Sequence, residues 1–348
     1  MIYLSLLIAV SITTTLLYFL RPLIQRIEST NNLNDNQPYK IPIIGGIALF
    51  CGFFLAVLLI DQPLSELRYL GASAIIFLIV GILYDFQEIS AKKLLVAEII
   101  VALILSIKGG AILNNIGAIL LISQEIELGV WTWPLTIIAI ISIINALKIS
   151  DGIEGLAAGL ALIALCSLAL ASWKMGLIQA LEILALIITV VITFLSFNLR
   201  FFRHPKKRVL LGTTGCLFLG LILAWFMITL SQEEQRAILP VTILWIFALP
   251  LFEMASFLIY QLFNRLDLFD AEWKPIHYYL LAADFTHFQT LSILLSFAFG
   301  FALVGIIGLL LAFSEIILFW TFNSLLIFYF VIHLAMSYHI QSKFWTSQ

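Results

Sequence analysis

The sequence predicts an all-α membrane protein with many transmembrane helices. Hydrophobic residues make up 62% of the 348 residues and charged residues only 11%, and the mean hydropathy is +1.11. A soluble domain carries about 25% charged residues, so this composition indicates that the bilayer is the solvent. The ten-residue alternation of a membrane β-barrel is missing from the sequence, and helices satisfy their own backbone polar groups within lipid.

Apolar stretches close to the length that spans a bilayer predict about eleven transmembrane helices in a single integral membrane domain, residues 1–348. They lie near 2–20, 43–60, 67–84, 93–108, 131–147, 155–172, 178–197, 209–230, 238–261, 291–312 and 315–335. The first stretch has no basic residue before it and no small-residue cleavage site, and Arg21 follows it directly. These features favour a retained first helix over a signal peptide.

The distribution of Lys and Arg predicts the orientation, because cytoplasmic loops are enriched in both. With the N-terminus outside, only Arg68, Lys108, Lys174 and Arg236 of the 18 Lys and Arg residues lie on the outer side. The C-terminus is then cytoplasmic. The cytoplasmic loops lie near 21–42, 85–92, 148–154, 198–208 and 262–290, and the long outer loop is 109–130, an expected hairpin or interfacial segment.

The segment from Asn145 to Gly159 places polar residues and glycines between two apolar stretches. Ionisable residues at the edge of the hydrocarbon are costly and usually line a cavity or substrate path. Glycines there let the backbone turn tightly and let a ligand approach closely. Further polar clusters at 33–46, 84–93, 198–216 and 262–290 share the predicted cytoplasmic face. We therefore expect one cytoplasmic cleft that resembles an active site.

Six residue strings in this order resemble the polyprenyl-phosphate N-acetylhexosamine-1-phosphate transferase family, whose members include the phospho-MurNAc-pentapeptide translocase. They are Pro42-Ile-Ile-Gly45-Gly46; Gly81-Ile-Leu-Tyr84-Asp85 with Lys93; Asn145 to Gly159; Asn198 with Leu211-Gly212-Thr213-Thr214-Gly215-Cys216; Pro250-Leu-Phe-Glu253; and Asp284-Phe-Thr-His287-Phe-Gln289-Thr290. Each string lies at the membrane end where the family carries its motif.

The resemblance implies a reaction in which a sugar 1-phosphate passes from a UDP-sugar to undecaprenyl or another polyprenyl phosphate and UMP is released. It further implies Mg²⁺ as cofactor, a multi-pass place in the bacterial inner (plasma) membrane, and a role in making cell-envelope polysaccharide or peptidoglycan. The expected partners are the lipid phosphate, the UDP-sugar and a second copy in a homodimer, and no nucleic acid.

The resemblance also assigns roles to individual residues. It implies Asp85, Asp151 and His287 as catalytic residues, with Asp85 and Asp151 also holding the metal. The substrate-binding residues that it implies are Lys93, Asn145, Lys148, Gly152, Glu154, Gly155 and Asn198.

The chain departs from the family pattern where the chemistry depends on it most. Tyr84 and Thr213 stand where the family has Asp, the second of these being a family metal ligand, and Lys148 stands where it has Asn. Gln289 and Thr290 replace two histidines. The loss of two carboxylates and gain of one ammonium shift the cleft's charge by +3, which favours phosphate and disfavours Mg²⁺.

Other interpretations stay open at this point. The departures are compatible with a slower transferase or with a protein that binds a lipid phosphate, a nucleotide sugar or a partner protein without turnover. A transporter of lipid-linked sugars would share the hydrophobicity, but we find neither an internal repeat nor paired broken spans. The sugar is not determined by the sequence.

Structural roles also compete with the functional ones. Asp151 could act as a helix N-cap, Asp85 as an interfacial helix terminator and Lys148 as one more cytoplasmic cation. Glu98, a carboxylate inside an apolar stretch, is expected to make a hydrogen bond between helices.

Overall fold

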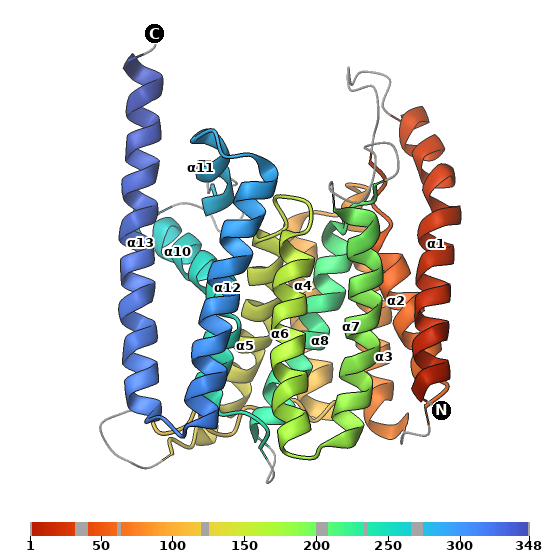
Figure 1. Ribbon diagram of the computed structural model, residues 1–348, viewed down its shortest axis with the longest axis horizontal. Helices are drawn as coiled ribbons and strands as arrows, with labels where there is room; N and C mark the ends of the chain where they lie inside the picture. The colour runs from red at the N-terminus through yellow and green to blue at the C-terminus, as the bar shows by residue number, and fades with distance from the viewer. Residues whose placement is uncertain are drawn as a thin grey trace.

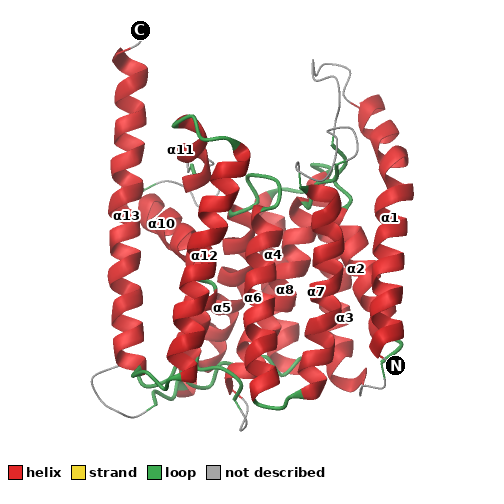
Figure 2. Cartoon of the chain, in the orientation of Figure 1, coloured by secondary structure: helices red, strands yellow, loops and turns green. Residues whose placement is uncertain are grey.

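A computed structural model describes residues 2–31, 41–60, 64–119, 125–199, 208–232, 236–265 and 274–346, and every regular element in these ranges is a helix (Figure 2). The α-helices are α1 (Ile2–Asn31), α2 (Gly45–Val57), α3 (Leu64–Asp85), α4 (Ala91–Lys108), α5 (Thr132–Ile149), α6 (Leu156–Lys174), α7 (Ile178–Asn198), α8 (Gly212–Gln232), α9 (Pro240–Ile246), α10 (Ala248–Asn264), α11 (Ile276–Ala282), α12 (His287–Leu310) and α13 (Glu315–Thr346). A 3₁₀ turn, Gly129–Trp131, precedes α5.

The structure confirms an all-α multi-pass membrane protein. Among the described residues, eight helices are long and apolar enough to cross a membrane, and the pair α9 and α10, bent by 87°, makes a ninth span if it is counted as one. The other two of the eleven predicted segments also form helices. One is α2, whose 13 residues extend only roughly 20 Å at 1.5 Å per residue. The other is α4, which carries three lysines and Glu98.

Successive long helices run in alternate directions, so that the two ends of the chain lie at opposite ends of the bundle (Figure 1). The polar segments 41–46, 84–93, 145–155 and 208–216 meet at one end, which we call the site end. The segments 109–119 and 125–130 lie at the other end, which we call the loop end. The predicted clusters thus share one face as expected. Residues 32–40, 120–124, 200–207 and 266–273 of the predicted loops lie outside the described residues.

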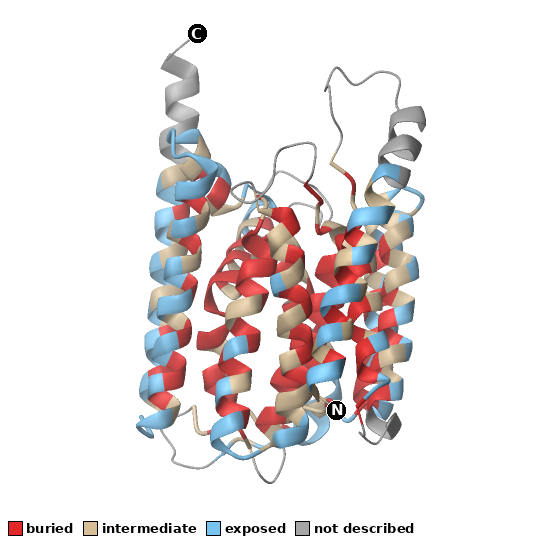
Figure 3. Cartoon of the chain, turned by 45° about the vertical axis from the view of Figure 1, so that its right-hand side comes forward, coloured by how far each residue is buried: buried red, intermediate tan, exposed pale blue. Residues whose placement is uncertain are grey.

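Helix α8 forms the centre of the bundle. In its most apolar stretch 89% of the residues are buried, against 17–61% in the other spans, and buried residues line the inside of the bundle in Figure 3. Glycines bring neighbouring backbones close to α8. A Cβ on Gly46 would lie 2.5 Å from the Gly215 nitrogen, and one on Gly81 would lie 2.6 Å from the Thr214 Cα. Because small residues let helices approach closely in lipid, α2 and α3 pack directly on the first turn of α8.

A short backbone pairing joins two of the motif segments at the site end. Ile43 and Leu210 form a parallel bridge. The Leu210 nitrogen donates to the Pro42 carbonyl at 2.9 Å, and the Gly45 nitrogen donates to the Leu210 carbonyl at 3.0 Å. The Pro-x-x-Gly-Gly segment before α2 is therefore fastened to the segment that leads into α8.

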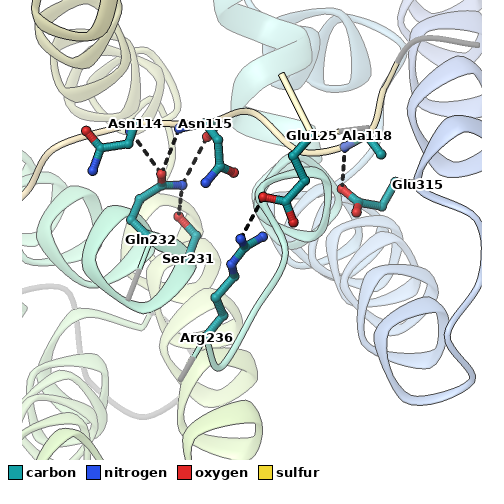
Figure 4. Close-up of polar contacts among 8 residues, drawn as sticks. All are labelled: Asn114, Asn115, Ala118, Glu125, Ser231, Gln232, Arg236 and Glu315. Atoms are coloured by element: carbon teal, nitrogen blue, oxygen red, sulfur yellow. Dashed lines mark hydrogen bonds and ion pairs between the residues drawn. The ribbon is translucent and has the colours of Figure 1, made fainter. Parts of the chain in front are cut away.

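At the loop end, the segments 109–119 and 125–130 pair with each other, in agreement with the hairpin that was one of the two structures expected for residues 109–130. Asn115 and Glu127 form an antiparallel bridge. Gln232, at the end of α8, accepts hydrogen bonds from the Asn114 and Asn115 amides at 2.9 and 3.0 Å (Figure 4). In the same view Arg236 pairs with Glu125 at 2.7 Å, and the Ala118 amide donates to Glu315, the first residue of α13. The loop thus ties the ends of α8 and α13 together.

The close packing of α2 on α8 leads to a stability prediction. Gly46→Ala places a methyl group against the α8 backbone, so we expect the free energy of unfolding to fall by about 1–3 kcal/mol. The helical glycine Gly300 provides the matched control, since a Cβ there meets no atom within 4 Å. Thermal unfolding in detergent should show a lower midpoint for Gly46→Ala and no loss for Gly300→Ala. Equal midpoints would contradict the close approach.

Candidate functional site

Asp85 closes the N-terminus of α8. Its carboxylate accepts hydrogen bonds from the Thr213 and Thr214 amides at 2.9 and 3.1 Å, and from the Thr214 hydroxyl at 2.7 Å. The first amides of a helix have no partner within the helix and carry its positive end, so a carboxylate is favourable there. These contacts support a structural role for Asp85 at a helix end. Asp85 is the last residue of α3, but the helix that its side chain caps is α8.

Asp151 lies in the turn between α5 and α6, outside the membrane-spanning segments, and faces the same region. Burial raises its pKa, a hydrogen bond with the Cys216 thiol opposes this effect, and the nearby Asp85 charge adds to it, so that the pKa is about 7. A carboxyl group with a pKa near 7 can take up or release a proton at neutral pH. The structure therefore brings the two predicted catalytic carboxylates together at the start of α8.

Lys148 and Asn145 are both engaged by Glu98. The Lys148 ammonium lies 3.1 Å from one carboxylate oxygen of Glu98, and the Asn145 amide donates to the other oxygen at 2.6 Å. Glu98 is 1% exposed and Lys148 is 28% exposed. Glu98 is thus the interhelical partner predicted for it, linking α4 to α5. Glu98 balances the charge of Lys148. The net charge of the site therefore rises by less than the +3 that the departures from the family pattern predicted.

Two further predicted binding residues, Glu154 and Asn198, contact the segment just before α8. Glu154 forms an ion pair with Arg208, and both side chains are largely buried. The Asn198 amide donates to the Val209 carbonyl at 2.7 Å. These contacts fix the backbone 208–211 that leads into α8, so Glu154 and Asn198 have structural partners in this state. Lys93 is exposed in the first turn of α4.

A histidine outside the family motifs, His277, also lies in this region. A Cβ on Gly152 would overlap the His277 imidazole, so the ring lies directly on the turn that carries Asp151. His277 is 8% exposed, and burial lowers its pKa to about 4, which makes the ring neutral at pH 7. Gly155 has φ of +88°, a backbone conformation that favours glycine and that begins α6.

His287 is exposed in the first turn of α12. The residues around it cap the start of that helix. Thr286 and Gln289 form a capping box, in which the Gln289 amide donates to the Thr286 hydroxyl and the Gln289 side chain accepts from the Thr286 amide. The catalytic assignment of His287 stays a prediction. For His277 the sequence contained one usable signal, its place ten residues before His287 in the same polar cluster.

A recess opens beside Asp85, with a volume of about 460 Å³ and lined by Tyr84, Asp85, Gln87, Ile89, Ser90 and Ala91. Tyr84, which takes the place of a family Asp, forms part of its wall. A larger cavity of about 660 Å³ lies at the loop end and contains none of the predicted site residues. Because Asp85 lines the smaller recess, we favour that recess over the larger cavity as the place where a ligand enters.

The side chains near Asp85 offer few ligands to Mg²⁺. One Asp85 oxygen accepts two hydrogen bonds and the other accepts one. In the described parts of the chain, no three His, Cys, Asp or Glu side chains are grouped so that they could hold a metal ion. Thr213 offers only a neutral hydroxyl where a carboxylate would suit a hard dication. These residues do not form a magnesium site by themselves.

The fold and this site define a polytopic membrane protein with a carboxylate pair at one membrane face, and comparisons with known proteins show what it is similar to. The model of glycosyl transferase family 4 matches residues 67–231. The undecaprenyl-phosphate alpha-N-acetylglucosaminyl 1-phosphate transferase of Escherichia coli K12 is 26% identical over 323 residues, covering 92% of this chain and 87% of the relative.

Two further relatives carry similar descriptions. The enzyme of the same description from Yersinia pestis is 29% identical over 278 residues, which cover 80% of this chain and 75% of the relative. The probable undecaprenyl-phosphate N-acetylglucosaminyl 1-phosphate transferase of Bacillus subtilis is 27% identical over 308 residues, covering 86% and 83%. The matched family model and these relatives agree with the resemblance that the motifs carry.

The contacts of Asp85 predict that it stabilises the protein in the absence of any ligand. Asp85→Ala leaves the α8 amides without an acceptor, so we expect the free energy of unfolding to fall by about 1–3 kcal/mol. Glu88→Ala, an exposed carboxylate three residues later, should leave it unchanged. Thermal unfolding with a chelator present measures both variants. If Asp85 serves only to bind a metal, the two variants will unfold alike.

The Lys148–Glu98 pair predicts an energetic coupling between α4 and α5. In a double-mutant cycle of Lys148→Met and Glu98→Gln, we expect a coupling energy of at least about 1 kcal/mol, because one charge alone is left poorly compensated. The cycle of Lys93→Met with Glu98→Gln is the control and should show none. A coupling near zero, combined with weaker ligand binding by Lys148→Met, would mean that Lys148 serves the substrate instead.

Proposed function

We propose that this protein transfers a sugar 1-phosphate from a UDP-sugar to a polyprenyl phosphate and releases UMP. The observation that carries the proposal is the pairing of Asp151, with its pKa near 7, and Asp85 at the start of α8, within a chain of this family. The names of the three relatives make undecaprenyl phosphate the first acceptor to test and N-acetylglucosamine the first sugar.

The reaction needs an attack by a phosphate oxygen of the lipid on the phosphorus that bears the sugar. The new P–O bond forms as the bond to UMP breaks, and UMP leaves with the bonding electron pair. A lipid phosphate has a second pKa of about 6, so an acceptor close to neutral pH holds a proton part of the time. Asp151 is suited to accept that proton, because general-base catalysis works best with a pKa near the working pH.

We further propose that the site end faces the cytoplasm of a bacterium, with the protein in the inner membrane. This orientation follows from the 14 to 4 division of the 18 Lys and Arg residues, and it gives the water-soluble UDP-sugar access to Asp151 and His277. The lipid chain stays in the bilayer while its phosphate reaches the site end. A homodimer is a prediction from the resemblance alone.

A second candidate function is binding without turnover. Tyr84 and Thr213 favour it, because each removes a carboxylate from the family pattern, and the described residues form no three-ligand metal group. Such a protein would hold the lipid phosphate, the nucleotide sugar or a partner protein at the site end.

An assay with purified protein, undecaprenyl phosphate and several UDP-sugars distinguishes the two candidates. We expect UMP release that depends weakly on Mg²⁺ and falls at least about 100-fold in Asp151→Asn, the scale on which loss of a general base acts. Glu125→Gln, at the loop end, serves as the control and should retain activity.

A negative result from this assay would be equally informative. Background UMP with every UDP-sugar would exclude the transferase proposal and favour the binding function. Restoring the family pattern with Tyr84→Asp and Thr213→Asp would then ask whether the carboxylates alone were lost. If UMP release stays at background after this restoration, the site has changed beyond those two positions.

A further inference from the structure

We propose that α13, the last helix, positions the nucleotide-sugar side of the site through two side chains, the partly buried Tyr329 and the buried His333. Neither residue touches the carboxylate pair. They hold the backbone immediately before His277, and that histidine packs on the turn that carries Asp151. The identity of the ligand rests on the proposed function, whereas the positioning itself rests on contacts within the protein.

The first contact links α10, α11 and α13. One carboxylate oxygen of Glu253 accepts a hydrogen bond from the Tyr329 hydroxyl at 2.6 Å and another from the Ile276 amide at 2.8 Å. Ile276 is the first residue of α11, and no side chain of its own segment caps that helix. Glu253, which is 3% exposed, therefore supplies an acceptor for the start of α11, and Tyr329 holds the carboxylate in place.

The second contact fastens the chain two residues earlier. The His333 Nε2 lies 2.9 Å from the Lys274 carbonyl oxygen, and since a carbonyl only accepts, the ring donates this hydrogen bond. His333 is 1% exposed. Its ring also meets Tyr279 edge to face, with centroids 5.0 Å apart. Lys274, Ile276 and Tyr279 are thus all held by α13, directly or through Glu253.

These contacts surround His277 without touching it, and that arrangement points to a positioning role. Helix α11 has only seven residues, too few to be stable by itself. Burying a carboxylate, a phenol and an imidazole is costly unless each is hydrogen-bonded. Here Glu253 and His333 each hydrogen-bond to the backbone of residues 274–276, and Tyr329 hydrogen-bonds to Glu253. The next residue is His277, whose side chain lies against Gly152. A shift of α11 would move the imidazole away from the Asp151 turn.

The placement of His277 indicates which substrate would bind more weakly if α11 were loosened. His277 and Gly152 belong to segments outside the membrane spans, on the side where a water-soluble ligand enters. A polyprenyl chain lies in the hydrocarbon, and only its phosphate reaches this level. Loosening α11 should therefore weaken binding of the nucleotide sugar and leave binding of the lipid phosphate nearly unchanged.

The test compares Tyr329→Phe and His333→Leu, which remove only the polar contacts, with His333→Gln, whose side-chain amide can still donate. We expect the KM for the UDP-sugar to rise about tenfold in the first two variants and the KM for undecaprenyl phosphate to stay within about twofold, as loss of one buried hydrogen bond implies. His333→Gln should recover most of the loss. Phe328→Leu, on the exposed side of α13, is the matched control.

Amide hydrogen exchange of residues 274–282 provides a readout that does not need activity. Exchange should rise about tenfold in Tyr329→Phe and His333→Leu relative to Phe328→Leu, since each lost hydrogen bond frees the segment it holds. Unchanged exchange, or KM values that rise equally for both substrates, would overturn the proposal. If wild-type protein releases no UMP, the proposed function fails, and the exchange measurement alone decides whether α13 positions this segment.

Discussion

The N-terminus of α8 is the constraint on which the rest of the structure depends. This helix is buried along almost its whole length, so its first amides cannot rely on water. Asp85 of α3 accepts from two of them, and the pairing of Leu210 with Pro42 and Gly45 holds the approach to the helix. Meeting the hydrogen-bonding needs of one helix end therefore brings three motif segments together, and Asp151 arrives beside them on the turn after α5.

The polar groups at the site end are largely paired with one another. Glu98 holds Lys148 and Asn145, Arg208 holds Glu154, and the α8 amides hold Asp85. Buried charges require such partners, so much of the family's polar pattern serves the architecture in this chain. The raised pKa of Asp151 marks it as the carboxyl group with the least compensation, which is why the proposed chemistry is assigned to it.

The two histidines near the site end differ in how far a local motif describes them. His287 matched a motif by its spacing from Asp284, but its position at the first turn of α12 gives the neighbouring Gln289 a capping function and leaves His287 at the surface. His277 had no motif to mark it. It packs against Gly152, while Glu253 of α10 and His333 of α13 hydrogen-bond to Ile276 and Lys274 just before it in the chain. Contacts between helices far apart in the chain leave no local pattern in the sequence.

The sequence by itself determined the membrane class, the helical segments and the resemblance to a family, because hydrophobic length and short motifs are local properties. It also indicated that the polar clusters share one face and that Glu98 bonds between helices. The tertiary structure decided which charges neutralise each other, that Asp85 caps α8, that α9 and α10 bend by 87°, and that His277 packs against Gly152. Those outcomes depend on distances between helices, and no single segment contains that information.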